Sequence, residues 1–351
     1  MDFLTNVNKT MSYIGLFFVV FVWGSAPLFT LQLYKFYSPT IRVCFSELVL
    51  VAAYLFMARK HLKKFNLSYL KIGIPTGIFM TLANICQKIG LLYTTPAKYA
   101  FLENLSCITV PVIMFILVRK KPKLTTILGC VVCLFSTFVL NGASFSGTAF
   151  GVGEILCGVA GLLYGFNIAL TGIYAKKLNT ALYLAVQAVT SFFVSLLFSV
   201  LFNFISIPTQ AGARIIEPIV FSFKPSHMLF VILLALISSA LCWTIRTNAM
   251  KHIDACIVAV IMPFSAAVTG ILSVFAGTDT FSPNLVLGIL LGLLAIFLSS
   301  FDDIFKINIQ AKNPLLRTRK YFFKKYLFIT RGVRFRYYRH RRNLRKQILI
   351  H

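Results

Sequence analysis

The sequence contains few charged residues, and acidic residues are the scarcest of them. Only 13% of the 351 residues are charged, and only nine are Asp or Glu. A soluble protein carries about a quarter charged residues, so this composition excludes an ordinary soluble domain. Because 58% of the residues are hydrophobic, we predict that lipid rather than water surrounds most of the chain.

Patterns typical of enzymes and ATP-driven pumps are also missing. The five histidines are scattered along the chain: His61, His227, His252, His340 and His351. None adjoins a group of carboxylates, so we expect no metal site, no catalytic residue and no cofactor. No Gly-rich loop ending in Gly-Lys-Ser/Thr is present, which argues against an ATP-driven pump. Cys130 and Cys133 have the spacing of a redox motif, but inside an apolar run they are better interpreted as small hydrophobic residues.

Ten apolar runs are long enough to cross a bilayer, for which a helix needs about 20 residues. They cover approximately residues 12–33, 38–58, 69–93, 96–118, 123–141, 149–175, 181–207, 226–247, 255–276 and 283–302. They are too long and too uniformly apolar for the strands of a membrane barrel. The first run is also long enough to remain as a helix rather than be cleaved as a signal peptide. We therefore predict an all-α membrane protein with ten transmembrane helices.

Lys and Arg residues are concentrated in alternate loops. They follow the second, fourth and sixth runs, as at Arg59, Arg119 and Lys176, and fill the segment after the tenth, whereas the intervening loops hold few. Because cytoplasmic loops carry the excess of positive charge, both termini are predicted to lie in the cytoplasm. With no targeting segment evident, we expect a multi-pass protein of the cell (plasma) membrane.

The two halves of the chain repeat the same features in the same order. Trp23 corresponds to Tyr164, each followed by a glycine, and Gly129 corresponds to Gly288. Five helices per half is an odd number, so the second half is inverted relative to the first, an arrangement that places a binding site near the middle of the membrane. The predicted organisation is a first repeat at residues 1–141, a linker at 142–150, a second repeat at 151–303 and a basic cytoplasmic tail at 304–351.

Six short segments of the sequence match motifs of a known protein family. They are residues 23–25, 39–42 and 93–100 in the first half, and 151–167, 249–255 and 279–288 in the second. With these segments in order, the sequence resembles the EamA family of the drug/metabolite transporter (DMT) superfamily over about residues 12–302. The resemblance implies a ten-helix carrier for small organic molecules.

Polar, charged and aromatic side chains inside the apolar runs are the candidate substrate-binding residues. They are Trp23, Arg42, Glu47, Asn84, Gln87, Lys88, Glu103, Asn104, Glu154, Tyr164, Asn167 and Gln187. A charge exposed to hydrocarbon costs about 3 kcal/mol or more, so the charged members should face a common interior. Ion pairs such as Arg42–Glu47 and Lys88–Glu103 or Lys88–Glu154 would lock the bundle. Alternatively, the cluster binds substrate, with Glu103 or Glu154 carrying a coupling proton.

Several uncharged candidates also have two interpretations. Asn84 and Gln87 are either hydrogen-bonding links between helices or substrate ligands. Trp23 and Tyr164 either wall a pocket or simply pack. Arg246, at the cytoplasmic end of its run, is expected to extend to the membrane surface.

The segment from residue 304 to 351 combines Lys and Arg with aromatic residues and contains no acid. Beside the inner leaflet, such a segment is expected to contact anionic lipids. A contact with a regulatory protein is the alternative, and nucleic acid is not an expected partner.

The function predicted from these features is secondary active transport of a small organic metabolite by alternating access, with protons as a candidate coupling ion. The mixed signs of the intramembrane charges favour an amino-acid-like or amphipathic solute. The alternatives are a drug or metabolite efflux carrier of broad specificity and, with less support, a membrane-embedded enzyme or a scaffold. We do not expect an enzyme.

Overall fold

The structure is a computed structural model that describes residues 2–33, 37, 39–93, 102–119, 121–140, 151–204, 207–208, 214–215, 224–275 and 281–312. The linker at 142–150, residues 94–100 of the first turn, Asp279 and the tail beyond Lys312 lie outside the described residues. The chain divides into two compact units, residues 1–300 and residues 301–351.

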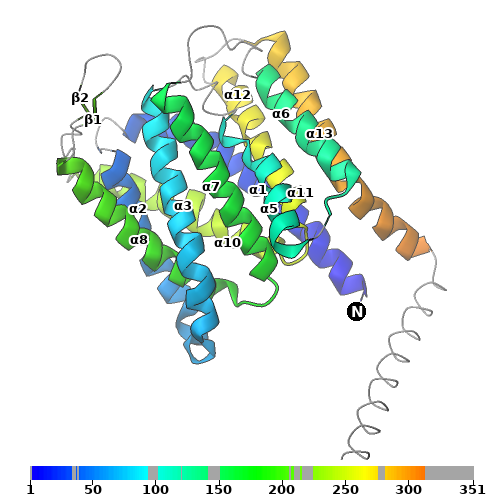
Figure 1. The fold of residues 1–351 in the computed structure, drawn as a ribbon, viewed down its shortest axis with the longest axis horizontal. Coiled ribbons are helices and arrows are strands. Elements are labelled where there is room, and N and C mark those ends of the chain that lie inside the picture. The colour runs from blue at the N-terminus through cyan, green and yellow to red at the C-terminus, as the bar shows by residue number, and fades with distance from the viewer. Residues whose placement is uncertain are drawn as a thin grey trace, which may run out of the picture. The chain divides into compact units, whose positions relative to one another are not determined.

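Within the described residues, the first half contains five helical spans (Figure 1). These are α1 (Asp2–Leu33), α2 (Pro39–Ala58), α3 (Leu67–Tyr93), a span that includes α5 (Ser106–Val118), and α6 (Leu124–Leu140). A short 3₁₀ helix, η1 (Arg59–Lys64), follows α2 and carries the basic residues of that loop.

The second half repeats this order with two interrupted spans. It contains α7 (Val152–Tyr174), α8 (Thr180–Phe204), α9 (Pro225–Leu234) with η2 (Ala235–Leu241) and α10 (Cys242–Ala249), α11 (Ala255–Ile261) with η3 (Met262–Phe264) and α12 (Ser265–Phe275), and α13 (Pro283–Lys312). Two antiparallel strands of two residues, β1 (Ile207–Pro208) and β2 (Arg214–Ile215), lie in the loop before α9.

The ten predicted spans are confirmed in number and order. Eight helical segments are long and apolar enough to cross a membrane, and α5 and α6 are shorter apolar helices. The helices extend beyond two predicted ends, because α1 begins at Asp2 and α13 continues to Lys312. Both extensions are more polar than the runs themselves, which a helix outside the hydrocarbon tolerates.

The distribution of side chains is the one expected when lipid is the solvent. Large apolar residues such as Ile116, Phe193 and Leu290 are exposed, whereas Gln87, Asn167 and other polar residues are buried. Because the bilayer offers no partners for polar groups, they are placed inside the bundle, where other helices supply them.

Helix packing repeats between the two halves. α3 packs against α7 and α8, and its counterpart in the second half, the α9–η2–α10 span, packs against α1 and α2. Gly24 and Gly165, at corresponding positions, both allow close approach of the other half. A Cβ on Gly24 would collide with Val268 and Ser265 of α12, and one on Gly165 with Thr109 of α5. The structure is therefore two inverted five-helix repeats whose contacts correspond.

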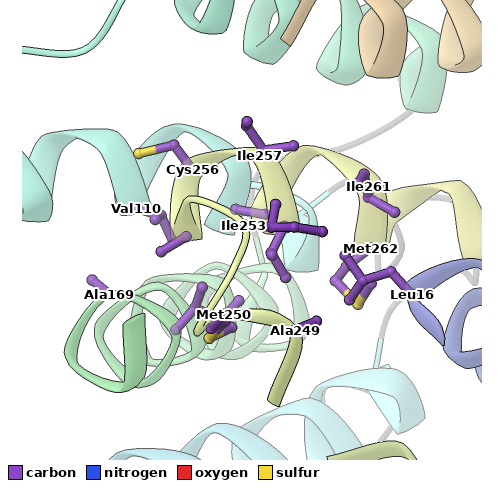
Figure 2. Packing of buried hydrophobic residues seen from close by; sticks show 14 of the residues in the cluster. Leu16, Val110, Ala169, Ala249, Met250, Ile253, Cys256, Ile257, Ile261 and Met262 are labelled. Carbon is purple, nitrogen blue, oxygen red and sulfur yellow. The ribbon is translucent and has the colours of Figure 1, made fainter. Parts of the chain in front are cut away.

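The largest cluster of buried hydrophobic residues is centred on α11, whose seven residues are all buried. Figure 2 shows Ile253 beside this helix, with Leu16 of α1, Val110 of α5 and Ala169 of α7 in the same cluster. Asp254 caps α11 through a hydrogen bond from a main-chain N–H. This apolar core joins both repeats and fixes α10, which precedes it in the chain.

Candidate functional site

Polar side chains of α3 and α7 form a hydrogen-bonded network. The Tyr164 hydroxyl lies 2.9 Å from Asn84 Oδ1 and 3.0 Å from Gln87 Oε1, so its single proton is shared between them. Gln87 Nε2 donates to Glu103 Oε1 at 2.7 Å. Asn84 and Gln87 are three residues apart and therefore lie on one face of α3. Four of the residues predicted from the sequence are thus brought together.

A second group of contacts is centred on Asn167 of α7, which is fully buried. Its Nδ2 donates to the main-chain oxygen of Thr76 at 3.0 Å, and its Oδ1 accepts from Arg246 Nη2 at 2.9 Å. Gln187 Nε2 of α8 reaches the same Thr76 oxygen at 3.4 Å. Asn167 therefore links α3 to α10, on opposite sides of the repeat boundary.

Arg246 lies inside the bundle, and the expectation that it extends to the membrane surface is wrong. Its side chain is only 2% exposed. The guanidinium carbon lies 3.9 Å from the centroid of the Trp243 ring and 5.9 Å from that of Trp23. The two indole rings are 5.3 Å apart and inclined at 57°. Stacking on aromatic faces, together with the bond to Asn167, fixes the orientation of this cation.

The direction of Arg246 depends on η2, a seven-residue π-helix in the middle of its span. Trp23 Nε1 donates to the main-chain oxygen of Ser238 at 2.7 Å, and the Tyr54 hydroxyl donates to that of Ala240 at 3.0 Å. A π segment inserts into an α-helix, changes the direction of all that follows and is frequent at functional sites. Side chains of α1 and α2 thus hold the segment that aims Trp243 and Arg246.

Glu47 of α2 is a second buried ionisable side chain. It is 3% exposed, and its Oε2 is buried without a hydrogen-bond partner among the described residues. No ion pair joins Glu47 to Arg246 among the described residues.

Two of the remaining predicted residues make contacts of their own. Asn104 Nδ2 donates to Thr137 Oγ1 of α6 at 3.4 Å, which ties the start of its span to α6. Glu154 accepts from the main-chain N–H of Gly151 at 3.0 Å and so caps the start of α7. Arg42 is half-buried.

The ion pairs considered from the sequence do not form among the described residues. Glu47 does not pair with Arg42, and Lys88, which is half-buried, pairs with neither Glu103 nor Glu154. Glu103 instead accepts the amide of Gln87. Among the printed contacts, Glu103 is held by a hydrogen bond, and Arg246 by a hydrogen bond and an aromatic ring.

A bundle of apolar helices with a polar interior built from both repeats is the architecture of a multi-pass membrane transporter. The model of the EamA-like transporter family matches residues 10–142 and 151–301, so the chain belongs to that family.

Two further comparisons concern a curated relative and a solved structure. An "Uncharacterized transporter" of Archaeoglobus fulgidus is 26% identical over 196 residues, which are 56% of this chain and 60% of the relative's length. A solved structure described as "Crystal structure of protein" has a TM-score of 0.67 at 16% identity and covers 83% of this chain and 97% of its own. The latter likeness concerns the fold alone.

Proposed function

We propose that the protein is a secondary active transporter that carries a small amino-acid-like or amphipathic organic solute by alternating access. The observation that carries this proposal is the polar interior. Tyr164, Asn84, Gln87 and Glu103 form one network, and Asn167 connects α3 to the buried Arg246. Buried polar groups on both repeats are expected of a carrier, because its two halves must release and rebind the cargo between them.

The proposed substrate site is the region between the α3–α7 network and Arg246. Trp23, Asn84, Gln87, Glu103, Tyr164 and Asn167 would face the solute, and Arg42, Glu47 and Lys88 would supply charge around it. Asn104, Glu154 and Gln187 would act by holding their helices in place, since each has a partner in its own surroundings.

The decisive experiment is uptake by proteoliposomes that contain the purified full-length protein. The probe is a uniformly ¹³C-labelled bacterial metabolite extract, and the solutes that accumulate are identified by mass spectrometry. We expect one or a few solutes to accumulate above protein-free liposomes, chemically unchanged. Uptake of many unrelated compounds would favour a broad-specificity carrier, a changed product would favour an enzyme, and no uptake would contradict transport.

Proton coupling is the second part of the proposal, with Glu103 as the coupling residue. A transported proton needs a carboxyl group that can be reached during the cycle, and Glu103 interacts with Gln87 through a single hydrogen bond. Uptake by wild type should rise when a proton gradient is imposed, and Glu103→Gln should flatten this dependence. An unchanged dependence in the variant would remove Glu103 from this role.

The proposed location is the plasma membrane with both termini in the cytoplasm and the basic tail on anionic lipids. The support is the alternation of Lys and Arg between loops. A reporter fused after His351 should be active only when it is a cytoplasmic reporter. Flotation with vesicles of phosphatidylglycerol, but not of phosphatidylcholine alone, should retain a peptide of residues 313–351.

A further inference from the structure

The turn between α2 and α3 gathers basic residues on the short 3₁₀ helix η1 (Arg59–Lys64), in which no residue is buried. The sequence contains no Asp or Glu between positions 48 and 102. Within the described part of the chain, Lys60, Lys63 and Lys64 form no ion pair. The counter-charge of this element therefore comes from outside the described residues.

The 3₁₀ geometry sorts the side chains of η1 into rows of different character. A 3₁₀ helix has about three residues per turn, so side chains three positions apart lie above one another. One row contains Arg59 and Leu62, and a hydrogen bond of 3.0 Å from the main-chain N–H of Phe65 to the oxygen of Leu62 extends the same spacing to Phe65. The other two rows are basic and contain Lys60 with Lys63, and His61 with Lys64.

The first row is apolar along most of its length. Leu62 is 55% exposed and Phe65 44%. The guanidinium carbon of Arg59 lies 3.8 Å from the centroid of the Phe56 ring in α2, so this cation covers an apolar neighbour. An exposed apolar row beside basic rows is the pattern of a helix that lies in the membrane interface, with the apolar side among acyl chains and the basic side toward the headgroups.

The length of α2 sets the level of η1 relative to the bilayer. α2 contains 20 residues. At about 1.5 Å per residue they span about 30 Å, which is the thickness of the hydrocarbon core. η1 follows α2 without a gap, and α3 begins at Leu67. A short turn between two spans stays at the membrane surface, so η1 lies beside the lipid headgroups.

Contacts with α3 and α8 hold the end of η1 in place. The Phe65 ring stacks on that of Tyr69, with centroids 5.8 Å apart and planes inclined at 15°. The Tyr69 hydroxyl accepts the main-chain N–H of Asn179 at 3.1 Å. Asn179 Oδ1 in turn accepts the N–H groups of Ala181 and Leu182 at the start of α8. A surface that is already ordered loses less entropy when a ligand binds.

We propose that η1 is a binding site for the headgroups of anionic phospholipids. Lys60 and Lys63 contact the phosphate groups, and Leu62 and Phe65 lie among the acyl chains. An anionic lipid supplies the counter-charge that the described residues lack, and a phosphate group accepts the compact ammonium of lysine. The site is separate from the basic segment at 304–351, and the inference does not depend on the transport function.

The experiment measures lipid contact at η1 itself with a fluorescent reporter in the full-length protein. Leu62→Trp adds an indole to the apolar row, and the signal of the two native tryptophans is subtracted with protein that lacks the reporter. Phosphatidylcholine nanodiscs contain an increasing fraction of phosphatidylglycerol or of phosphatidylcholine with brominated acyl chains, which quench indole fluorescence on contact. We expect both lipids to quench, with half-quenching at a lower fraction of brominated phosphatidylglycerol.

Charge removal then assigns the preference to η1. The reporter protein should prefer phosphatidylglycerol by up to about thirtyfold, which corresponds to about 2 kcal/mol for two basic residues near the membrane surface. Lys60→Gln together with Lys63→Gln should bring the two lipids near equality. Lys121→Gln together with Lys123→Gln is the matched control, because it removes the same charge from the exposed turn after α5. The control should retain the preference.

Every other outcome overturns the inference. Absence of quenching by both lipids would show that η1 lies away from the membrane, and equal quenching in the reporter protein would show no selection of anionic lipid. A preference that survives the change at Lys60 and Lys63, or is lost equally in the control, would belong to charges elsewhere. Loss of the preference on addition of inorganic phosphate at constant ionic strength would mean that the site takes a free anion. Where Leu62→Trp fails to fold, Leu67→Trp replaces it, because Leu67 is 71% exposed.

Discussion

The contact between α3 and α7 and the contact between α1 and the η2–α10 segment occupy corresponding places in the two repeats. In the first, Tyr164 meets the side-chain amides of Asn84 and Gln87. In the second, Trp23, at the position equivalent to Tyr164, donates to the main-chain oxygen of Ser238. One contact therefore uses side chains on an uninterrupted helix, and the other uses the backbone of an interrupted one.

This difference shows how a duplicated scaffold acquires an asymmetric site. The α3–α7 side offers amides, a hydroxyl and the Glu103 carboxylate, whereas the α1–α10 side offers two indole rings and the Arg246 cation. An asymmetric solute can be oriented only by walls that differ. The π segment is the structural reason for the difference, because it directs Arg246 inward.

The largest effect is expected from removing the π-helical segment η2 that interrupts the α9–α10 span. Deleting Leu236 shortens η2 by one residue and allows a continuous α-helix, which rotates Trp243 and Arg246 by about 100° relative to α9. We expect uptake to fall to the level of protein-free liposomes while the protein still inserts. Uptake is measured with the labelled extract, and insertion is checked by gel filtration.

Leu236→Ala is the matched control for this deletion, because the Leu236 side chain is exposed on the outer face of the bundle. It should retain uptake near the wild-type level. Retained uptake in the deletion variant would show that the interruption does not set the position of Arg246.

The spans and the equivalence of Trp23 with Tyr164 could be predicted from the sequence, because lipid demands long apolar runs and a duplication preserves order. The structure confirms that both residues make polar contacts across corresponding helix pairs. The partners of Trp23 could not be predicted, because a main-chain oxygen becomes available only when the helix is interrupted. Residues 235–241 contain neither Gly nor Pro to mark that interruption.

The prediction for Arg246 failed for a related physical reason. A basic residue near the end of an apolar run reaches the surface when its helix is regular, but here the preceding π segment turns it toward Asn167. For Glu154 the sequence did contain a signal. Glu154 lies in the first turn of an apolar run, where an acidic side chain can accept the free main-chain N–H groups of the helix start.

A smaller effect is expected at Asn167, the residue that connects the α3–α7 contact to Arg246 of α10. Asn167→Leu removes the acceptor of Arg246 and the donor to Thr76, and we expect the free energy of unfolding to fall by about 2–3 kcal/mol. Asn167→Asp should be more stable than Asn167→Leu, because its carboxylate would pair with the guanidinium. The midpoint of thermal unfolding in nanodiscs measures both effects.

The Asp variant also separates a structural role of Arg246 from a binding role. If Arg246 receives the carboxylate of the cargo, an internal carboxylate at position 167 competes with it, so stability is restored while affinity for the solute falls. Restoration of both stability and affinity would show that Arg246 serves packing alone.

The smallest expected effects come from the two equivalent aromatic residues. Tyr164→Phe removes one shared hydrogen bond between α7 and α3, and Trp23→Phe removes the bond to Ser238. Each should lower the free energy of unfolding by about 1 kcal/mol, the usual size for a polar contact between membrane helices.

The two variants should differ in their effect on recognition of the solute's carboxylate. Trp23→Phe also removes a ring beside Arg246 and loosens η2, so it should weaken recognition of the carboxylate, measured as a smaller preference for a free amino acid over its methyl ester. Tyr164→Phe leaves Arg246 in contact with Trp243 and Asn167 and should leave that preference unchanged. Equal loss of preference in the two variants would mean that both sides of the bundle contact the carboxylate, and the asymmetry between the repeats would then have no role in orienting the cargo.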